Sequence, residues 1–472
     1  MLRKLIKTII PGKTEALLWL MVSVAIIVFC AKSMGRYERL SAYYFDLGIM
    51  HQVVANTAHG HFLEITDPNF YTQGNRLGYH FDFILAFFAP FYIFFNDARV
   101  LLAGQSIIIG LGALPLFLLA KDHLKSKKFA LSIAALYLLY YPIHATIIAD
   151  FHSVTLATTF ILWTWYGMEK KKYALVWTMV ILAWFTKENV PLITGAIGFY
   201  FFLKGDRRHG GTLFALSGAW FLLVYKGIMP YFRTGQHFAE SYYSSNIVEN
   251  LMRLFSEESF KYLYLLTFPL LFIPFLAPQF LLLALPEWLI ILLSSNENMR
   301  QLQYHYTALL TPFIFIALIY GLKKVAHKKI FIVILLLVQC SLLFTRSNLL
   351  KPYPANEDQL RIVNVWQEKL KDPRIPVATS GHLASHFSGR RYFYNFFYDF
   401  AYWQQGITDE QIDGLISHYE KAEYVLIKES ELDITDERVM RYYFHLVTNP
   451  AFEKVFDESG IEVYKKVYNQ ET

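Results

Sequence analysis

An aspartate surrounded by aromatic residues opens the first long polar stretch of the chain, in Tyr43-Tyr44-Phe45-Asp46-Leu47-Gly48. No basic residue stands at helical or strand spacing from Asp46, so the pattern does not indicate a surface ion pair. A carboxylate among aromatic rings is partly desolvated and binds a proton more readily, which suits general-base catalysis. Asp is also a preferred helix N-cap, and a helix is expected over residues 47–58. We predict that Asp46 is the catalytic base, a role that a capping function does not exclude.

Other polar side chains recur where apolar segments end, and we expect them to bind substrate. They are His80, Asp82, Asp150, His152, Lys187, Glu188, Glu287, Arg300 and His305. A helix does not point residues two apart toward each other, so His80 could be functional while Asp82 caps a helix, or the reverse.

The short turn that carries Asp150 and His152 needs polar residues in any case. Together with Asp46, this pair could hold a phosphate or a divalent metal such as Mg²⁺ or Mn²⁺, which prefer oxygen ligands. The metal requirement stays open at this point, because the spacing of two residues alone is a weak pattern.

Three further stretches of the sequence carry charged or titratable candidates. Lys187 and Glu188 are adjacent in a short loop, where such a pair is ordinary, although a lone outward lysine runs against the positive-inside trend. Glu287 follows Pro286 within an apolar segment, and an acid at membrane depth usually faces the bundle interior and has a function. Arg300 and His305 lie in a cationic, hydroxyl-rich stretch that could hold a phosphate, although its tyrosines also fit an interfacial aromatic belt.

The composition is that of an integral membrane protein. Of 472 residues, 55% are hydrophobic and only 17% are charged, against about 25% charged residues in a soluble domain. The net charge of +6 is no sign of nucleic-acid binding, since the basic residues form short clusters between apolar segments. The clusters are Arg3/Lys4/Lys7 and residues 121–128, 170–172, 204–209 and 323–329. The positive-inside rule places such clusters in the cytoplasm.

Apolar segments near 20 residues predict about eleven membrane helices. We expect them over residues 16–34, 98–120, 129–148, 153–168, 173–186, 190–204, 212–230, 262–277, 279–294, 305–322 and 329–346. Counting the apolar residues 81–95 as a further span would put most basic clusters outside, so we expect a re-entrant or interfacial helix there. The N-terminus is then inside, as an uncleaved first helix, and the C-terminus is outside.

The chain therefore divides into a transmembrane domain over 1–349 and a soluble extracytoplasmic α/β domain over 350–472. The first outer loop, residues 35–97, is large and contains interfacial helices. In the second domain, residues 375–379, 391–396 and 422–428 read as strands, and 452–466 reads as a hairpin turning at Glu458-Ser459-Gly460. Both cysteines, Cys30 and Cys340, lie in apolar segments, so a structural disulfide is not expected.

Several of these motifs together resemble a bacterial family of predicted membrane proteins, domain of unknown function 2079. The matching stretches are Phe45-Asp46-Leu47-Gly48, the His80 segment with Pro90, Asp150-Phe151-His152, Thr186-Lys187-Glu188, Leu285-Pro286-Glu287 with Ser294-Ser295, His305-Tyr306, and residues 379–382 through Arg390-Arg391. That family resembles a branch of the GT-C glycosyltransferases, which carry an Asp in the first outer loop and interfacial helices after it. The paired acidic dipeptide that several GT-C branches keep in this loop is absent from the sequence.

The resemblance implies a polytopic α-helical membrane protein of the bacterial cytoplasmic membrane. Its expected activity is transfer of a sugar from a polyprenyl-phosphate donor to an acceptor on the outer face, with Asp46 as the base. Two alternatives remain from the residues themselves. One is a lipid or solute transporter that uses Glu287 and Lys187 as a polar pathway, which the lack of an internal repeat disfavours. The other is a catalytically inert scaffold.

Overall fold

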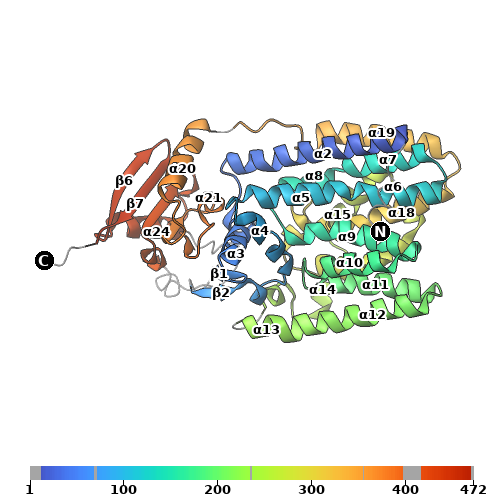
Figure 1. Cartoon of the computed structure of the whole chain (residues 1–472), viewed down its shortest axis with the longest axis horizontal. Helices are drawn as coiled ribbons and strands as arrows, with labels where there is room; N and C mark the ends of the chain where they lie inside the picture. Colours follow the sequence, from blue (N-terminus) through green and yellow to red (C-terminus); the bar gives the residue numbers. More distant parts are fainter. Residues whose placement is uncertain (1–11, 68–71, 234–236, 355, 397–415, 469–472) are drawn as a thin grey trace. The chain divides into compact units, whose positions relative to one another are not determined.

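The computed structural model describes residues 12–67, 72–233, 237–354, 356–396 and 416–468. The chain forms two compact units (Figure 1). The helical unit comprises Met1–Ser33, Leu77–Ile84 and Ala103–Pro352, and the sheet unit comprises Met34–Arg76, Leu85–Leu102 and Tyr353–Thr472. Most of the polar stretch after the first apolar segment thus belongs to the same unit as the C-terminal residues, an association that the sequence did not indicate.

The helical unit is built almost entirely from α-helices and short helical turns. Its helices are α2 (Lys13–Glu38), α5 (Arg99–Leu111), α6 (Ala113–Leu124), α7 (Lys127–Leu138), α8 (Tyr141–Ile148), α9 (Ser153–Glu169), α10 (Tyr173–Trp184), α11 (Val190–Leu203), α12 (Arg207–Leu222), α13 (Met229–Phe232), α14 (Ile247–Arg253), α15 (Glu257–Thr267), α16 (Pro278–Leu281), α17 (Leu285–Leu292), α18 (Thr311–Lys324) and α19 (Lys328–Thr345). The ends of α2 and α5 belong to the sheet unit.

Four helical stretches in the described residues are long and apolar enough to cross a membrane: Lys13–Glu38, Arg99–Leu124, Arg207–Phe232 and Lys328–Thr345. The bent pair α7 and α8, with 41° between its members, would add a fifth. α10, α11 and the stretch Pro278–Leu292 are apolar but shorter. The number of eleven spans therefore stays a prediction.

Besides the bent pair α7 and α8, two other expected spans, 262–277 and 279–294, are divided into shorter helical pieces. Over 262–277, α15 ends at Thr267 and is followed by 3₁₀ turns, with Leu271 and Phe272 at positive φ. Over 279–294, three short helical pieces replace one helix. Prolines explain the breaks, because each removes a backbone donor and crowds the preceding turn; they are Pro269, Pro274, Pro278 and Pro286.

The core of the helical unit is centred on α18. Its residues Phe313–Ile319 are at most 1% exposed, so every face of this helix is covered. α11 and α12 approach so closely that their backbones touch. A Cβ on Gly198 would lie 2.5 Å from the Phe214 nitrogen, and one on Gly210 would lie 2.7 Å from the Gly198 oxygen. Small residues at such crossings let apolar helices pack without side chains between them.

The basic clusters of the helical unit gather at one end of it. Lys127, at the start of α7, pairs with Glu15 of α2 at 2.6 Å. Lys170, at the end of α9, pairs with Asp122 of α6 at 2.7 Å. Other side-chain contacts place the ends of α10, α12 and α18 here as well. Tyr173 of α10 stacks on His209 of α12, and Tyr320 of α18 donates a hydrogen bond to Glu169 of α9. The N-terminal cluster Arg3/Lys4/Lys7 lies outside the described residues.

Chain continuity sets the opposite end of the helical unit. α9 has 17 residues and is about 25 Å long, so the residues that precede it lie far from the basic end. The same holds for the loop between α10 and α11. Asp150, His152, Lys187 and Glu188 therefore share the end away from the basic clusters. Assigning the basic end to the cytoplasm remains a proposal.

The expected interfacial helix over 81–95 is two short pieces. They are the 3₁₀ helix η3, Phe83–Phe87, and the α-helix α4, Ala89–Tyr92, with Pro90 in its first turn. Five and four residues are too few to cross a bilayer. Their position at a membrane surface stays a prediction.

The sheet unit contains a five-stranded mixed sheet in the order β4-β3-β5-β7-β6. Its strands are β3 (Val377–Thr379), β4 (Phe393–Asn395), β5 (Tyr424–Lys428), β6 (Phe452–Glu458) and β7 (Ile461–Lys466). β3 is parallel to β4 and β5, while β7 is antiparallel to β5 and β6. Every segment predicted as a strand is a strand, and the hairpin turns where expected, with Ser459 and Gly460 at positive φ.

The remaining elements of the sheet unit are α3 (Ile49–Ala58), β1 (Glu64–Thr66), β2 (Gln73–Asn75), α4, α20 (Glu357–Lys369), α21 (Ala384–Phe387) and α24 (Glu437–Thr448). A buried amide ties the early chain to the late chain. Gln52 donates to Thr66 Oγ1 at 3.0 Å and to the Arg391 carbonyl at 3.0 Å. Arg391 in turn pairs with Glu64 at 2.8 Å. Side-chain hydrogen bonds across more than 300 residues thus hold this unit together.

Candidate functional site

The first candidate site lies in the helical unit, where the loop between α10 and α11 meets the segment before η3. His80 Nδ1 lies 3.0 Å from Glu188 Oε1, and the Phe81 amide donates to Glu188 Oε2 at 3.1 Å. Glu188 is buried. Burial alone would raise the pKa of Glu188, but the charge and hydrogen bond of His80, with the charge of Lys187, hold it below its usual range. The structure therefore brings together two of the predicted residues, 108 positions apart.

His237 is a third member that the list of predicted site residues did not contain. Its Nδ1 accepts a hydrogen bond from the Ala239 amide at 3.1 Å, so Nε2 carries the proton and donates to the Tyr79 carbonyl at 3.1 Å. Burial, with the nearby His80 charge, lowers the pKa of His237 to about 4. A ligand atom from each of His80, Glu188 and His237 lies within 4.8 Å of the others. A lone histidine in a polar loop gave no sequence sign of this proximity.

The same loop also reaches α17. Asn189 donates to Glu287 Oε2 at 2.7 Å, and Glu287 is buried in the first turn of α17. Glu287 therefore faces the interior, as predicted for an acid in an apolar segment. The charge of Lys187 interacts electrostatically with Glu188, Glu287 and His305. We call His80, Lys187, Glu188, Asn189, His237 and Glu287 the polar cluster.

A pair of stacked histidines lies next. The rings of His152 and His305 are 3.7 Å apart at 26°. His152 donates from Nδ1 to the Asp150 carbonyl at 2.9 Å, and its amide donates to Gln105 Oε1 at 2.9 Å. The buried Nδ1 of His305 makes no hydrogen bond to any residue that the structure describes. The structure thus joins the predicted His152 and His305, and it adds Gln105, which the sequence did not single out.

Arg300 makes backbone contacts near the end of α17. It is buried and donates to the carbonyls of Ser294 and Ile291, at 2.7 and 3.4 Å. These oxygens are at the end of α17, where the last turn of a helix leaves carbonyls without intrahelical partners. These two contacts are those of a helix C-terminal cap, while the buried Arg300 Nε makes no hydrogen bond to any residue that the structure describes. Phosphate binding by Arg300 stays a prediction.

Asp82 and Asp150 are both buried, with 4% and 3% of their surfaces exposed. Asp82 directly precedes η3, and Asp150 lies between α8 and α9. The metal or phosphate set predicted from Asp46, Asp150 and His152 combines residues of both units. It therefore remains a prediction.

Asp46 lies in the sheet unit, in the short π-helical turn η1, Tyr44–Gly48, which runs directly into α3. Tyr43 and Gly48 occupy the N-cap positions of these two helices, so the expected capping role of Asp46 is wrong. Its side chain is partly exposed within the first helical turn, where a negative charge is favourable.

The motif around Asp46 packs on the segment between β3 and β4. Tyr43 lies edge-on to His382 at 5.1 Å, and a Cβ on Gly381 would collide with the Tyr43 ring. Ser388 donates to the Gly48 carbonyl at 2.7 Å. Two motifs that carried the family resemblance, residues 45–48 and 379–391, thus form one packed region.

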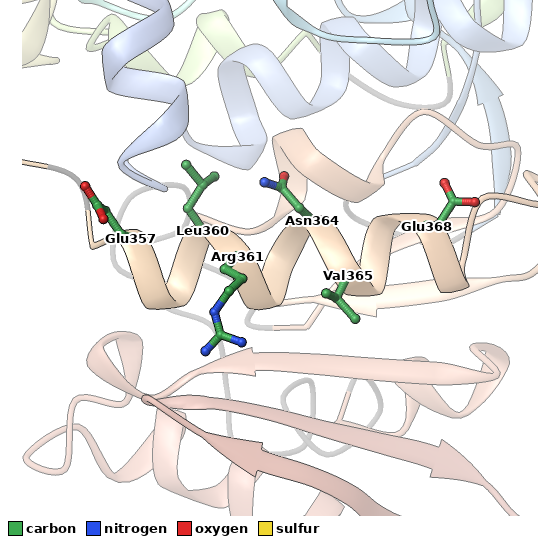
Figure 2. A pocket seen from close by; sticks show the side chains of 6 residues that line it. All are labelled: Glu357, Leu360, Arg361, Asn364, Val365 and Glu368. Atoms are coloured by element: carbon green, nitrogen blue, oxygen red, sulfur yellow. The ribbon is translucent and has the colours of Figure 1, made fainter.

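A shallow hollow of about 500 Å³ lies along α20. Figure 2 shows its lining side chains, Glu357, Leu360, Arg361, Asn364, Val365 and Glu368, all projecting from this one helix. A ligand site normally draws on several elements that enclose it. We therefore place the candidate chemistry in the polar cluster and around Asp46.

Residues 36–463 match the family described as "Predicted membrane protein (DUF2079)". The chain belongs to this family. The match covers both units and confirms the resemblance inferred from the motifs. No curated protein matches the sequence.

Solved structures share the fold at low sequence identity. The arabinofuranosyltransferase AftD from Mycobacteria matches with a TM-score of 0.55 and 14% identity, over 96% of this chain and 40% of AftD. ArnT from Cupriavidus metallidurans, in the apo state, matches with a TM-score of 0.55 and 12% identity, over 97% of this chain and 99% of ArnT. This chain spans less than half of AftD, whereas its match to ArnT runs over nearly the whole of both chains. The protein is thus a membrane protein with the fold of GT-C glycosyltransferases.

Proposed function

We propose that the protein is a membrane glycosyltransferase that moves a sugar from a polyprenyl-phosphate donor to an acceptor on the outer face of the bacterial cytoplasmic membrane. The observation that supports this most is the fold, shared over nearly the full length of both chains with ArnT, in a chain that also carries Asp46 in its first polar stretch. Asp46 is partly exposed, as a group that meets substrate must be.

In the proposed reaction, Asp46 removes the proton from the acceptor hydroxyl as the acceptor oxygen bonds to the anomeric carbon of the sugar. The bond between that carbon and the donor phosphate oxygen breaks, and the lipid phosphate leaves as an anion. Cationic groups stabilise such a leaving group. We assign this role to the cation Lys187, with His80, His152 and His305 as hydrogen-bond donors to the phosphate, while Asp82, Asp150, Glu188 and Glu287 hold or orient these groups. We propose that Arg300 adds its charge to the same phosphate binding.

The test compares Asp46→Asn with the parent protein in lipid nanodiscs. Mass spectrometry of lipid that co-purifies with the chain identifies the donor, and labelled donor then measures transfer. Asn keeps the size of Asp and removes the base, so transfer should fall by about 10²–10⁴-fold. Asp436→Asn is the matched control, because Asp436 caps α24 through its side chain and Asn caps equally well.

Parent-like transfer by a folded Asp46→Asn protein would remove Asp46 from the reaction. Absence of any polyprenyl-phosphate sugar on the parent protein, together with no transfer from such donors, would count against the glycosyltransferase itself. Equal losses in both Asp→Asn variants would point to a folding defect instead, which thermal unfolding of each variant reveals.

A further inference from the structure

Each of the three consecutive residues Tyr79, His80 and Phe81 contacts either His237 or Glu188. The Tyr79 carbonyl accepts from His237, the His80 ring contacts Glu188, and the Phe81 amide donates to Glu188. Two imidazoles and a carboxylate thus converge, held by a single stretch of backbone. Their ligand atoms lie within 4.8 Å of one another.

From this geometry we infer that His80, Glu188 and His237 bind a divalent metal ion of the Zn²⁺ class. Two imidazole nitrogens and one carboxylate oxygen are a ligand set that zinc accepts, and it leaves at least one position for water or an anionic oxygen. These donors differ from the oxygen-rich set that Mg²⁺ or Ca²⁺ prefers. The inference concerns residues and a metal class other than those predicted from Asp46 and Asp150.

The distances need little change for a metal to enter between two of the three groups. His80 Nδ1 and Glu188 Oε1 are 3.0 Å apart. Two ligands of a tetrahedral zinc, each about 2.0–2.1 Å from the ion, are roughly 3.3 Å apart. The cation would replace a proton between these atoms, and the second oxygen of Glu188 would keep its bond to the Phe81 amide.

His237 supplies the third ligand, and its hydrogen bonds fix which ring nitrogen carries the proton. Its Nε2–H donates to the Tyr79 carbonyl, which leaves the lone pair on Nδ1. Metal-bound histidines commonly donate their other N–H to a carbonyl, which orients the ring. Binding through Nδ1 would cost the hydrogen bond from the Ala239 amide, and binding through Nε2 would cost the one to the Tyr79 carbonyl.

The experiment uses the full chain, purified in detergent, stripped with a chelator and titrated with Zn²⁺ alone against a chromophoric competitor. We expect close to one Zn²⁺ per chain. Each of His80→Gln, Glu188→Gln and His237→Gln should weaken binding by at least about 100-fold, since even outer contacts of a metal site contribute 10–100-fold. His123→Gln is the matched control, because His123 pairs with Glu169 at 2.7 Å in the same way.

The parent chain itself provides a second measurement that needs no variant. X-ray absorption of the Zn²⁺-loaded protein should show two imidazole ligands. Three outcomes would each overturn the inference: no stoichiometric Zn²⁺ on the parent, a bound ion without imidazole ligands, or parent-like affinity in the three folded variants. None of these readouts involves sugar transfer, so they stand or fall separately from the proposed function.

Discussion

Glu188 holds two consecutive residues at once, the ring of His80 at 3.0 Å and the amide of Phe81 at 3.1 Å. The carboxylate comes from the loop between α10 and α11, and its partners come from the segment that leads into η3. One buried side chain therefore anchors residues 80 and 81 to the loop between α10 and α11.

Glu188→Ala should destabilise the protein by about 2–4 kcal/mol, since it removes the hydrogen-bonding partner of the buried Phe81 amide and of the His80 ring. Glu188→Gln keeps an acceptor for Phe81 and should cost less. Denaturant unfolding in detergent with excess chelator measures both without any contribution from metal. Glu257→Ala, at an exposed carboxylate, should change stability by no more than about 0.5 kcal/mol. Equal stability of Glu188→Ala and Glu257→Ala would mean that the contacts of Glu188 contribute nothing.

The stability of the sheet unit should fall in mild acid through His386. This histidine is buried, donates to the Tyr37 carbonyl at 3.1 Å and stacks on the Tyr37 ring. Burial lowers the pKa of His386 from 6.5 to about 4. The folded state therefore favours the neutral ring, and its stabilisation is complete above about pH 6.5 and is lost as the pH falls toward 4.

A pKa change of this size corresponds to about 3 kcal/mol. His386→Gln retains an N–H donor but does not titrate. Unfolding temperatures of parent and variant, followed from pH 7.5 to 4.5, should therefore converge as the pH falls. Parallel curves would show that protonation of His386 does not couple to unfolding.

Two glycines of α12 should respond oppositely to alanine. Gly210 touches the backbone of α11 at Phe202 and Gly198, so Gly210→Ala must push the two helices apart and should cost about 1–3 kcal/mol. A Cβ on Gly218 meets nothing within 4 Å, so Gly218→Ala should be neutral or stabilising by up to about 1 kcal/mol. Thermal unfolding in detergent compares the two, and a stabilising Gly210→Ala would contradict the close crossing.

Cysteine labelling tests the assignment of the basic end to the cytoplasm. In a background lacking Cys30 and Cys340, Lys128→Cys lies in the basic cluster at the start of α7, and Glu453→Cys lies on β6. An impermeant thiol reagent added to intact cells should label only Glu453→Cys. Permeabilisation should then expose Lys128→Cys. Labelling of Lys128→Cys in intact cells would reverse the proposed orientation.

Short sequence patterns predicted the elements whose structure depends on neighbouring residues. The strands of the sheet unit follow short apolar segments, and the hairpin turns at Ser459 and Gly460 because both residues tolerate positive φ. Charge clustering identified which helix ends lie together. The breaks in the expected spans 262–277 and 279–294 are also local, since four prolines mark them in the sequence.

Pairings between distant segments could not be predicted in this way. Nothing near His80 in the sequence indicates Glu188 or His237, because no local spacing relates groups that meet only after the helices pack. A capping role was also expected for Asp46, at the start of the helix that follows it. The turn η1 begins two residues before Asp46, however, so Tyr43 occupies the N-cap position. The contacts of Arg300 with the carbonyls at the end of α17 were not predicted either, because they depend on where that helix ends.

The composition of the sheet unit has a consequence for how the protein is made. Its early pieces end at Leu102 and its last piece begins at Tyr353, so about 250 residues must be synthesised in between. At about 5–20 residues per second, this takes roughly 10–50 s. During that interval Gln52 and Glu64 lack the partners around Arg391 that complete their hydrogen bonds. The helical unit can therefore insert into the membrane before the sheet unit is complete. During that stage the region around Asp46 lacks its C-terminal strands and is accessible to proteases and chaperones.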